Sequence, residues 1–201
     1  MIIFLSQFSF RTPYPKRKIN SIYYDTYDYR SLEDSIEGGS CRTKYRIRWY
    51  GNKQSVSNAT LEIKKKKGHL SWKQLKKDSF RICSHANTWG TFLASNSGSR
   101  VSDCFLLNKQ PKSIITYDRE YYVSFNGKVR VTIDQNIKTF NQVNYKKPNF
   151  SKFRNHIGFV IFEIKVSQEN EYLVKEVLKD FPFSAKRFSK YCESILPRCY
   201  F

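Results

Sequence analysis

Residues 44–51 read Lys44-Tyr45-Arg46-Ile47-Arg48-Trp49-Tyr50-Gly51, in which basic and apolar side chains alternate up to a closing glycine. β-Branched and aromatic residues favour a strand here. Because successive side chains of a strand point to opposite faces, Lys44, Arg46 and Arg48 share one face, and Tyr45, Ile47 and Trp49 share the other. Three neighbouring cations repel one another, so the pattern indicates a polyanion bound against this face.

The same alternation recurs later in the chain. It runs through residues 61–66, 129–134 and 162–166, and Arg119 ends a similar run that begins at residue 114. Strands that are charged on one face and apolar on the other are typical of a closed barrel with a wet, charged interior. Antiparallel strands with solvated outer faces are the alternative. The charged faces are mostly cationic and include three acids, Glu62, Asp134 and Glu163, which favours the barrel, because a solvated face mixes both signs more evenly.

The composition predicts one folded domain over residues 1–201 with a polyanionic partner. Forty per cent of the residues are hydrophobic and 16% are aromatic, enough for a sizeable core with many strands. The formal net charge of +19 is extreme for 201 residues. Such a charge implies nucleic acid, polyphosphate, a nucleotide or an anionic membrane surface as the partner.

The cysteines and the apolar runs indicate a cytoplasmic protein. The five cysteines are odd in number, and none forms a CxxC pair, which argues against a disulfide framework or a zinc site. The apolar start, residues 1–5, has no basic region before it and is too short for a signal peptide or a membrane span. No other apolar run is long enough to cross a bilayer.

Seven strands and three helices are predicted. The strands are residues 19–25, 42–50, 59–66, 70–80, 113–124, 129–134 and 158–166. A short helix covers residues 29–37, and two helices finish the chain, one through residues 173–181 and one that Ser184 caps and that continues to Ile195. Residues 1–19 and 136–155 are interpreted as connections, and residues 82–111 give little signal beyond a loop at 96–99.

Several segments together resemble the VTC domain, the polyphosphate polymerase domain of the vacuolar transporter chaperone complex. They are residues 19–26, 44–51, 61–64, 117–119, 129–134, 162–165 and 187–191, in the family's order, and the resemblance covers about residues 10–195. It implies an α+β triphosphate tunnel fold, an antiparallel β-barrel of about eight strands lined with Lys and Arg and followed by C-terminal helices. It also implies ATP and polyphosphate as ligands and a divalent metal, commonly manganese, with magnesium as the alternative.

The resemblance assigns site residues by position. The family's basic tunnel residues match Arg46, Arg48, Lys64, Lys73, Arg119, Arg130, Arg187 and Lys190, and its metal-binding glutamate matches Glu163. We also assign substrate binding to Ser189, which lies in the last motif, and to Lys66 and Lys165, which lie on the charged strands. We expect Glu62 to orient Lys64 or Lys66 through an ion pair, and we expect the scattered histidines to be surface residues.

One departure from the family bears on activity. The family begins with a strand whose basic residue faces the tunnel, and this chain begins just before the second family strand. Residues 1–10 would supply a strand without a lysine for the interior, or the true start of the gene lies upstream.

Four functions remain open from the sequence. An ATP-dependent polyphosphate polymerase needs charge neutralisation and alignment rather than a nucleophilic side chain, and no convincing His, Cys or Ser constellation is present. A non-catalytic polyphosphate-binding module is the second possibility, favoured by the missing strand. A triphosphate hydrolase of the same fold would have more paired glutamates, and nucleic-acid binding would rest on charge alone, so we expect no nucleic-acid partner.

Overall fold

A computed structural model describes residues 9–51, 56–68, 70–82, 88–89, 93–95, 108–155, 160–179, 181, 184, 186 and 188–196. The chain divides into two compact units. Unit 1 comprises Met1–Lys18, Tyr117–Ile137 and His156–Phe188, and unit 2 comprises Ile19–Thr116, Lys138–Asn155 and Ser189–Phe201. Whether the whole chain acts as one domain stays a prediction.

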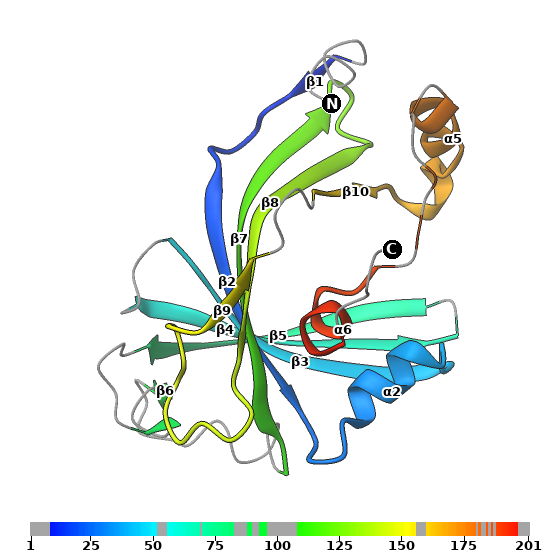
Figure 1. Ribbon diagram of the computed structural model, residues 1–201. Helices are drawn as coiled ribbons and strands as arrows, with labels where there is room; N and C mark the ends of the chain where they lie inside the picture. The colour runs from blue at the N-terminus through cyan, green and yellow to red at the C-terminus, as the bar shows by residue number, and fades with distance from the viewer. Residues whose placement is uncertain are drawn as a thin grey trace. The chain divides into compact units, whose positions relative to one another are not determined.

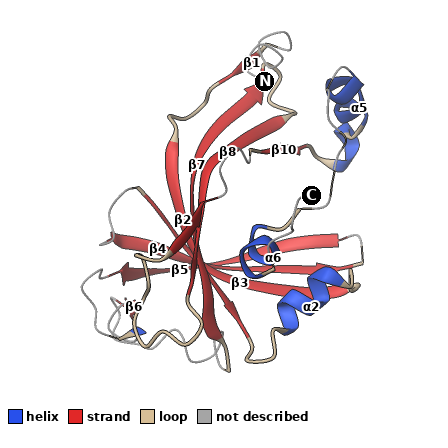
Figure 2. Cartoon of the chain, in the orientation of Figure 1, coloured by secondary structure: helices blue, strands red, loops and turns tan. Residues whose placement is uncertain are grey.

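Antiparallel strands dominate the described residues (Figures 1 and 2). Their order is β10-β8-β7-β2-β3-β4-β5-β6, with β1 beside β7 and β9 beside β8. The strands are β1 (Phe10–Arg11), β2 (Arg17–Asp25), β3 (Cys41–Tyr50), β4 (Val56–Lys67), β5 (Leu70–Ile82), β6 (Leu93–Ser95), β7 (Gln110–Ser124), β8 (Arg130–Asn141), β9 (Phe153–Asn155) and β10 (Ile161–Lys165). Within these residues no pairing joins β10 to β6, so the observed sheet is open and barrel closure stays a prediction.

The seven predicted strands are all present, with shifted ends. The largest error concerns residues 136–155, where a connection was predicted and the structure has the second half of β8 and all of β9. The two apolar residues of this segment that the structure buries are Ile137 and Phe140. They are spaced by three residues, so they do not show the strict alternation that marks a strand. The possible strand in residues 1–10 lies mostly outside the described residues, of which Phe10 belongs to β1.

The alternation in β3 buries the apolar side chains of one face, as predicted. In unit 2, Ile47 and Trp49 of β3 are buried in one cluster. The other buried members of that cluster are Ile22, Tyr24, Ala59, Leu61, Ile63, Ile114 and Phe140. A smaller core in unit 1 is formed by Val129, Val131 and Ile133, against which side chains of β10 and Leu173 pack. Burial of these apolar side chains fixes which face of each strand is polar.

The helices are short and belong to different units. α2 (Arg30–Ile36) and α6 (Lys190–Ile195) lie beside each other in unit 2, and η1 (Gln168–Asn170) and α5 (Tyr172–Lys179) lie in unit 1 (Figure 1). The predicted cap at Ser184 was wrong: α6 starts six residues later, and Ser189 caps it by accepting a hydrogen bond from the Cys192 backbone N–H at 3.4 Å. Ser189 has the extended backbone that an N-cap residue needs.

Two further expectations can be compared with the structure. None of the described helices combines the length and apolar character that crossing a bilayer requires. Cys41 and Cys192 are free thiols, and Cys83, Cys104 and Cys199 lie outside the described residues.

Candidate functional site

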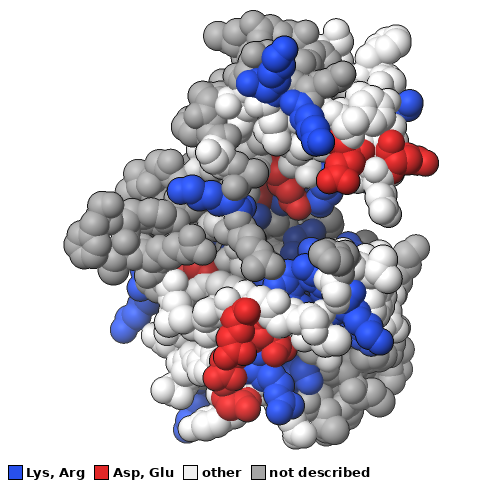
Figure 3. Space-filling view, turned by 90° about the vertical axis from the view of Figure 1, so that its right-hand side faces the viewer, with Lys and Arg blue, Asp and Glu red and all other residues white. Residues whose placement is uncertain are grey.

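Unit 2 gathers basic residues on the polar face of three neighbouring strands. The register sets Lys44 of β3 opposite Lys64 of β4, and Lys64 opposite Lys73 of β5. Arg42 faces Lys66 in the next row. We call the set Arg42, Lys44, Arg46, Arg48, Lys64, Lys66 and Lys73 the cationic face. Figure 3 shows Lys and Arg side chains at the surface in both halves of one view of the molecule. Like charges directly opposite each other destabilise a sheet, so these rows are costly unless an anion binds there.

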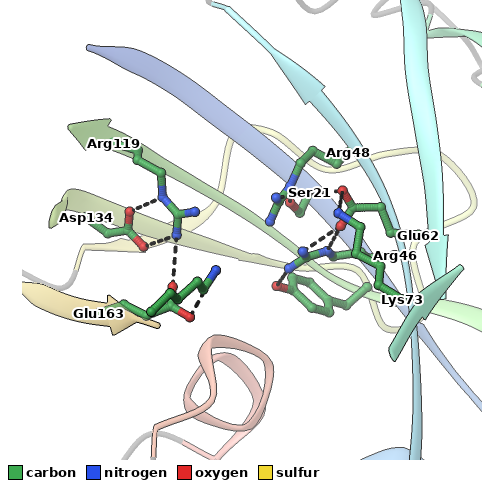
Figure 4. A network of polar contacts seen from close by, with 10 residues as sticks. Ser21, Arg46, Arg48, Glu62, Lys73, Arg119, Asp134 and Glu163 are labelled. Atoms are coloured by element: carbon green, nitrogen blue, oxygen red, sulfur yellow. Dashed lines mark hydrogen bonds and ion pairs between the residues drawn. The ribbon is translucent and has the colours of Figure 1, made fainter. Parts of the chain in front are cut away.

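One buried acid organises the centre of the cationic face. Glu62 accepts hydrogen bonds from Arg46 Nε at 2.6 Å and from Lys73 Nζ at 3.0 Å, and Arg48 Nη1 lies 3.8 Å away (Figure 4). The expected ion pair of Glu62 with Lys64 or Lys66 stays a prediction, and the contacts found are to Arg46, Lys73 and Arg48. Residues i and i+2 of one strand lie farther apart than directly opposed residues of neighbouring strands, so the cross-strand Arg46 is the better partner.

The cations dominate the electrostatics of the two acidic groups near them. Burial alone would raise the pKa of Glu62, but Arg46, Arg48 and Lys73 outweigh it and hold this pKa below its ordinary value. Burial would likewise raise the pKa of Tyr23, yet Arg46, Arg48 and Lys190 lower it. The Tyr23 hydroxyl accepts a hydrogen bond from Arg46 Nη1 at 3.2 Å. The cationic face, together with Lys190, therefore favours the charged form of the acidic groups beside it.

The first turn of α6 meets the cationic face. Lys44 Nζ donates a hydrogen bond to Ser189 Oγ at 2.9 Å, and Lys190 is close enough to Tyr23 to lower its pKa. Burial lowers the pKa of Lys44, and the charges of Arg42 and Lys64 add to that decrease. In unit 2 the structure thus brings together seven of the residues that we assigned from sequence: Arg46, Arg48, Lys64, Lys66, Lys73, Ser189 and Lys190. Arg187 lies outside the described residues.

Unit 1 carries a second group of charged residues. Arg119 holds Asp134 with two hydrogen bonds, of 2.5 Å from Nε and 2.7 Å from Nη2, and its Nη2 lies 3.8 Å from Glu163 (Figure 4). Lys165 lies 3.4 Å from Glu163 and opposite Arg130 in the register. Burial would lower the pKa of Arg119, but the hydrogen bond to Asp134 outweighs it and raises this pKa.

Glu163 is the acid that the family resemblance assigns to a divalent cation. Its side chain is 42% exposed and its ion pairs are loose, at 3.4 and 3.8 Å, whereas both oxygens of Asp134 are engaged by Arg119. No cluster of three or more His, Cys, Asp or Glu occurs in the part of the chain that the structure describes. One carboxylate is enough for Mg²⁺ or Mn²⁺ when substrate phosphates and water supply the other ligands.

The structure also adds residues that the sequence did not single out. Ser21 accepts a hydrogen bond from Arg48 Nε at 3.4 Å, and Tyr23 accepts one from Arg46. Asp25 and Tyr191 meet through a hydrogen bond of 2.6 Å. All four lie in the first or the last segment of the resemblance, which was the available signal, but nothing in either segment alone indicates which side chains meet.

Comparison with known families gives a match to the VTC domain over residues 6–197, nearly the whole chain. The protein belongs to the VTC domain family. No match was found among curated proteins.

Solved structures give the fold. The protein is similar to the putative adenylyl cyclase HpAC1 from Hippeastrum, with 16% identity, a TM-score of 0.51, and 95% of this chain and 85% of that chain covered. It also matches the PH1819 protein from Pyrococcus horikoshii OT3 (15% identity, TM-score 0.49, 96% and 88% covered) and a putative adenylate cyclase from Bacillus halodurans (12%, 0.48, 90% and 83%). The VTC match and the likeness to the Hippeastrum protein indicate the triphosphate tunnel fold.

Proposed function

We propose that this VTC domain is an ATP-dependent polyphosphate polymerase, with the cationic face as its phosphate-binding surface. The observation that carries the proposal is the row Lys44–Lys64–Lys73, in which three lysines oppose one another on neighbouring strands. Strands lie about 4.8 Å apart, so the row offers a positive charge at each step across the sheet. A chain of linked phosphates supplies negative charge at comparable, regular intervals and relieves the repulsion.

Phosphoryl transfer on such a surface needs alignment and charge neutralisation. An oxygen of the terminal phosphate of the chain attacks the γ-phosphorus of ATP, the bond from that phosphorus to the β–γ bridging oxygen breaks, and ADP leaves. Arg46 and Arg48 are held by Glu62 and Ser21, so their guanidinium groups are oriented before substrate arrives. Lys64, Lys66, Lys73 and Lys190 provide further point charges, and Ser189 provides a hydroxyl beside Lys44.

We assign metal binding to Glu163 and supporting charge to Arg119, Arg130 and Lys165. A bound Mn²⁺ or Mg²⁺ would neutralise the charge that develops on the transferred phosphate. Arg119 and Lys165 place positive charge beside the Glu163 carboxylate. The same proposal makes ATP and polyphosphate the partners, expects no nucleic-acid partner and places the protein in the cytoplasm.

The direct test is incubation of the purified protein with ATP and Mn²⁺, followed by gel analysis for polyphosphate. Arg46→Ala and Glu163→Ala are tested beside the wild type. We expect polymer from the wild type and at least a hundredfold less from each variant, in line with the loss of one group that stabilises transition-state charge. A wild type that binds polyphosphate but forms no polymer would overturn the polymerase and leave the binding module.

Triphosphate hydrolysis is the second candidate, because the Hippeastrum protein that shares this fold is described as having a dominant triphosphatase activity. Release of inorganic phosphate from tripolyphosphate, without polymer formation from ATP, would favour it. The loose single carboxylate of Glu163 and the absence of a larger acidic cluster in the described residues favour the polymerase.

A further inference from the structure

Two segments of the family resemblance, residues 19–26 and 187–191, are 166 positions apart at the residues where they meet. Their contact centres on Asp25, whose side chain is completely buried in unit 2. Its Oδ1 accepts hydrogen bonds from the backbone N–H groups of Thr26 at 2.8 Å and Ser31 at 2.9 Å. Its Oδ2 accepts from the Leu32 N–H at 3.1 Å and from the Tyr191 hydroxyl at 2.6 Å. Asp25 therefore joins the start of α2 to α6.

Tyr191 is the part of α6 that is fixed most firmly. It is 2% exposed, its hydroxyl donates to Asp25, and its ring stacks on Tyr23 at 5.5 Å with an interplanar angle of 13°. A helix of six residues is too short to be stable by itself, so its position depends on contacts of this kind.

The two residues before Tyr191 are those that reach the cationic face. Ser189 accepts the hydrogen bond from Lys44. The charge of Lys190 lowers the pKa of Tyr23, whose hydroxyl accepts a hydrogen bond from Arg46. Loss of the Tyr191–Asp25 hydrogen bond would free the first turn of α6, and Lys190 with it, while leaving the basic side chains of β3, β4 and β5 in place. The effect would appear as weaker anion binding.

We propose that Asp25 is a positioning residue that, through the Tyr191 hydroxyl, holds α6 so that Lys190 takes part in binding the phosphate chain on the cationic face. The inference rests on the proposed function for its ligand and is independent of whether the bound phosphate is transferred. It gives a role to two residues that no sequence assignment included.

The test measures the affinity of the full chain for tripolyphosphate by isothermal titration calorimetry without metal. We compare the wild type, Tyr191→Phe, Lys190→Ala and the double variant. Tyr191→Phe should weaken binding about tenfold, since a hydrogen bond to a buried carboxylate is lost and part of that energy holds α6. In the Lys190→Ala background the same change should cause no further loss, because its effect passes through Lys190.

The matched control is Tyr24→Phe. Tyr24 is the neighbour of Tyr23 and is also buried, but its hydroxyl has no hydrogen-bond partner among the residues that the structure describes, so its removal should leave the affinity unchanged. Thermal unfolding of each variant is measured in parallel. A merely structural role of Asp25 would lower the melting temperature of Tyr191→Phe and leave its affinity at the wild-type value, which would overturn the proposal.

Independent, multiplying losses in the double variant would overturn it as well. Should Tyr191→Phe not fold, Asp25→Asn replaces it: its oxygen keeps the bonds from Thr26 and Ser31, and the NH₂ group in the place of Oδ2 can no longer accept from Leu32 or Tyr191, so weaker binding is expected again. Failure of the phosphate-binding surface would be seen differently: the wild type itself would not bind tripolyphosphate, and the positioning role would fall with it, whereas failure of the polymerase alone would leave this binding intact. Binding that depends on Lys190 but not on Tyr191 would remove the positioning role alone.

Discussion

Replacement of Glu62 by Gln should destabilise the protein, because Glu62 is the buried acid at the centre of the cationic face. The Glu62 side chain is 6% exposed and contacts Arg46, Lys73 and Arg48. Removing one partner of a buried ion pair costs about 3–5 kcal/mol, because the remaining charge stays desolvated. The Arg46 and Lys73 side chains are 25% and 43% exposed, so water screens part of this loss, and we expect about 2–3 kcal/mol.

The assay is urea unfolding at neutral pH and low salt, without polyanions. For a chain of this size the loss corresponds to a fall in melting temperature of about 4–12 °C. Glu163→Gln is the matched control, because its contacts are longer and its side chain is 42% exposed, and it should cost less than about 1 kcal/mol. Equal losses in the two variants, or a loss below about 1 kcal/mol for Glu62→Gln, would refute the reasoning.

The pH dependence gives a second check on Glu62. Its pKa is lower in the folded protein than its ordinary value of 4.5, so its ionised form stabilises the fold above that value. This contribution is lost as the pH falls through the folded-state pKa. The stability difference between wild type and Glu62→Gln should therefore be full at neutral pH and shrink in acid, and a constant difference would contradict the assigned cause.

Three further predictions concern other parts of the molecule. Asp134→Asn should lower the free energy of unfolding in urea by about 3 kcal/mol, because the buried Arg119 loses the negative charge and one of the two acceptor oxygens of its partner. An unchanged free energy of unfolding would show that the ion pair does not stabilise the fold. Lys64→Gln should raise the melting temperature slightly at low salt and weaken tripolyphosphate binding, since it relieves the repulsion with Lys44 and Lys73; a fall in stability would show that the row is not strained. Trp49→Ala should cost about 3–5 kcal/mol by leaving a cavity in the unit 2 core, and wild-type stability would contradict its place there.

The strands could be predicted from the sequence because burial selects one face and leaves a repeating trace. In residues 44–51 every second residue is apolar, and the structure buries Ile47 and Trp49 as that pattern requires. The second half of β8 gives no such trace: Lys138 and Thr139 separate the buried Ile137 and Phe140. A pattern of period two is lost there, although hydrogen bonding to β9 continues the sheet.

Site residues could be predicted as a set but not as pairs. Alternation shows that Lys44, Arg46 and Arg48 share a face, whereas the partner of each depends on the register between strands, which the residues of one strand do not encode. The register puts Arg46 opposite Glu62 and Lys44 opposite Lys64, so a cation faces an acid in one row and another cation in the next. The hydrogen bond between Tyr191 of α6 and Asp25 could not be predicted from the sequence for a related reason. These two residues meet only when two segments distant in the sequence fold against each other.

The difference between a cation that faces an acid and lysines that face one another has a physical consequence for binding. Arg46 and Arg48 are held by Glu62 and Ser21, and such fixed guanidinium groups lose little conformational freedom when they bind phosphate. The Lys44–Lys64–Lys73 row favours binding for a different reason: the repulsion between its lysines falls when a polyanion binds. A site with one Glu62 among seven cations thus combines preorganised donors with a stored repulsion that a phosphate chain releases. A second acid in the lysine row would remove that driving force, so Lys64→Glu should abolish tripolyphosphate binding while it stabilises the free protein.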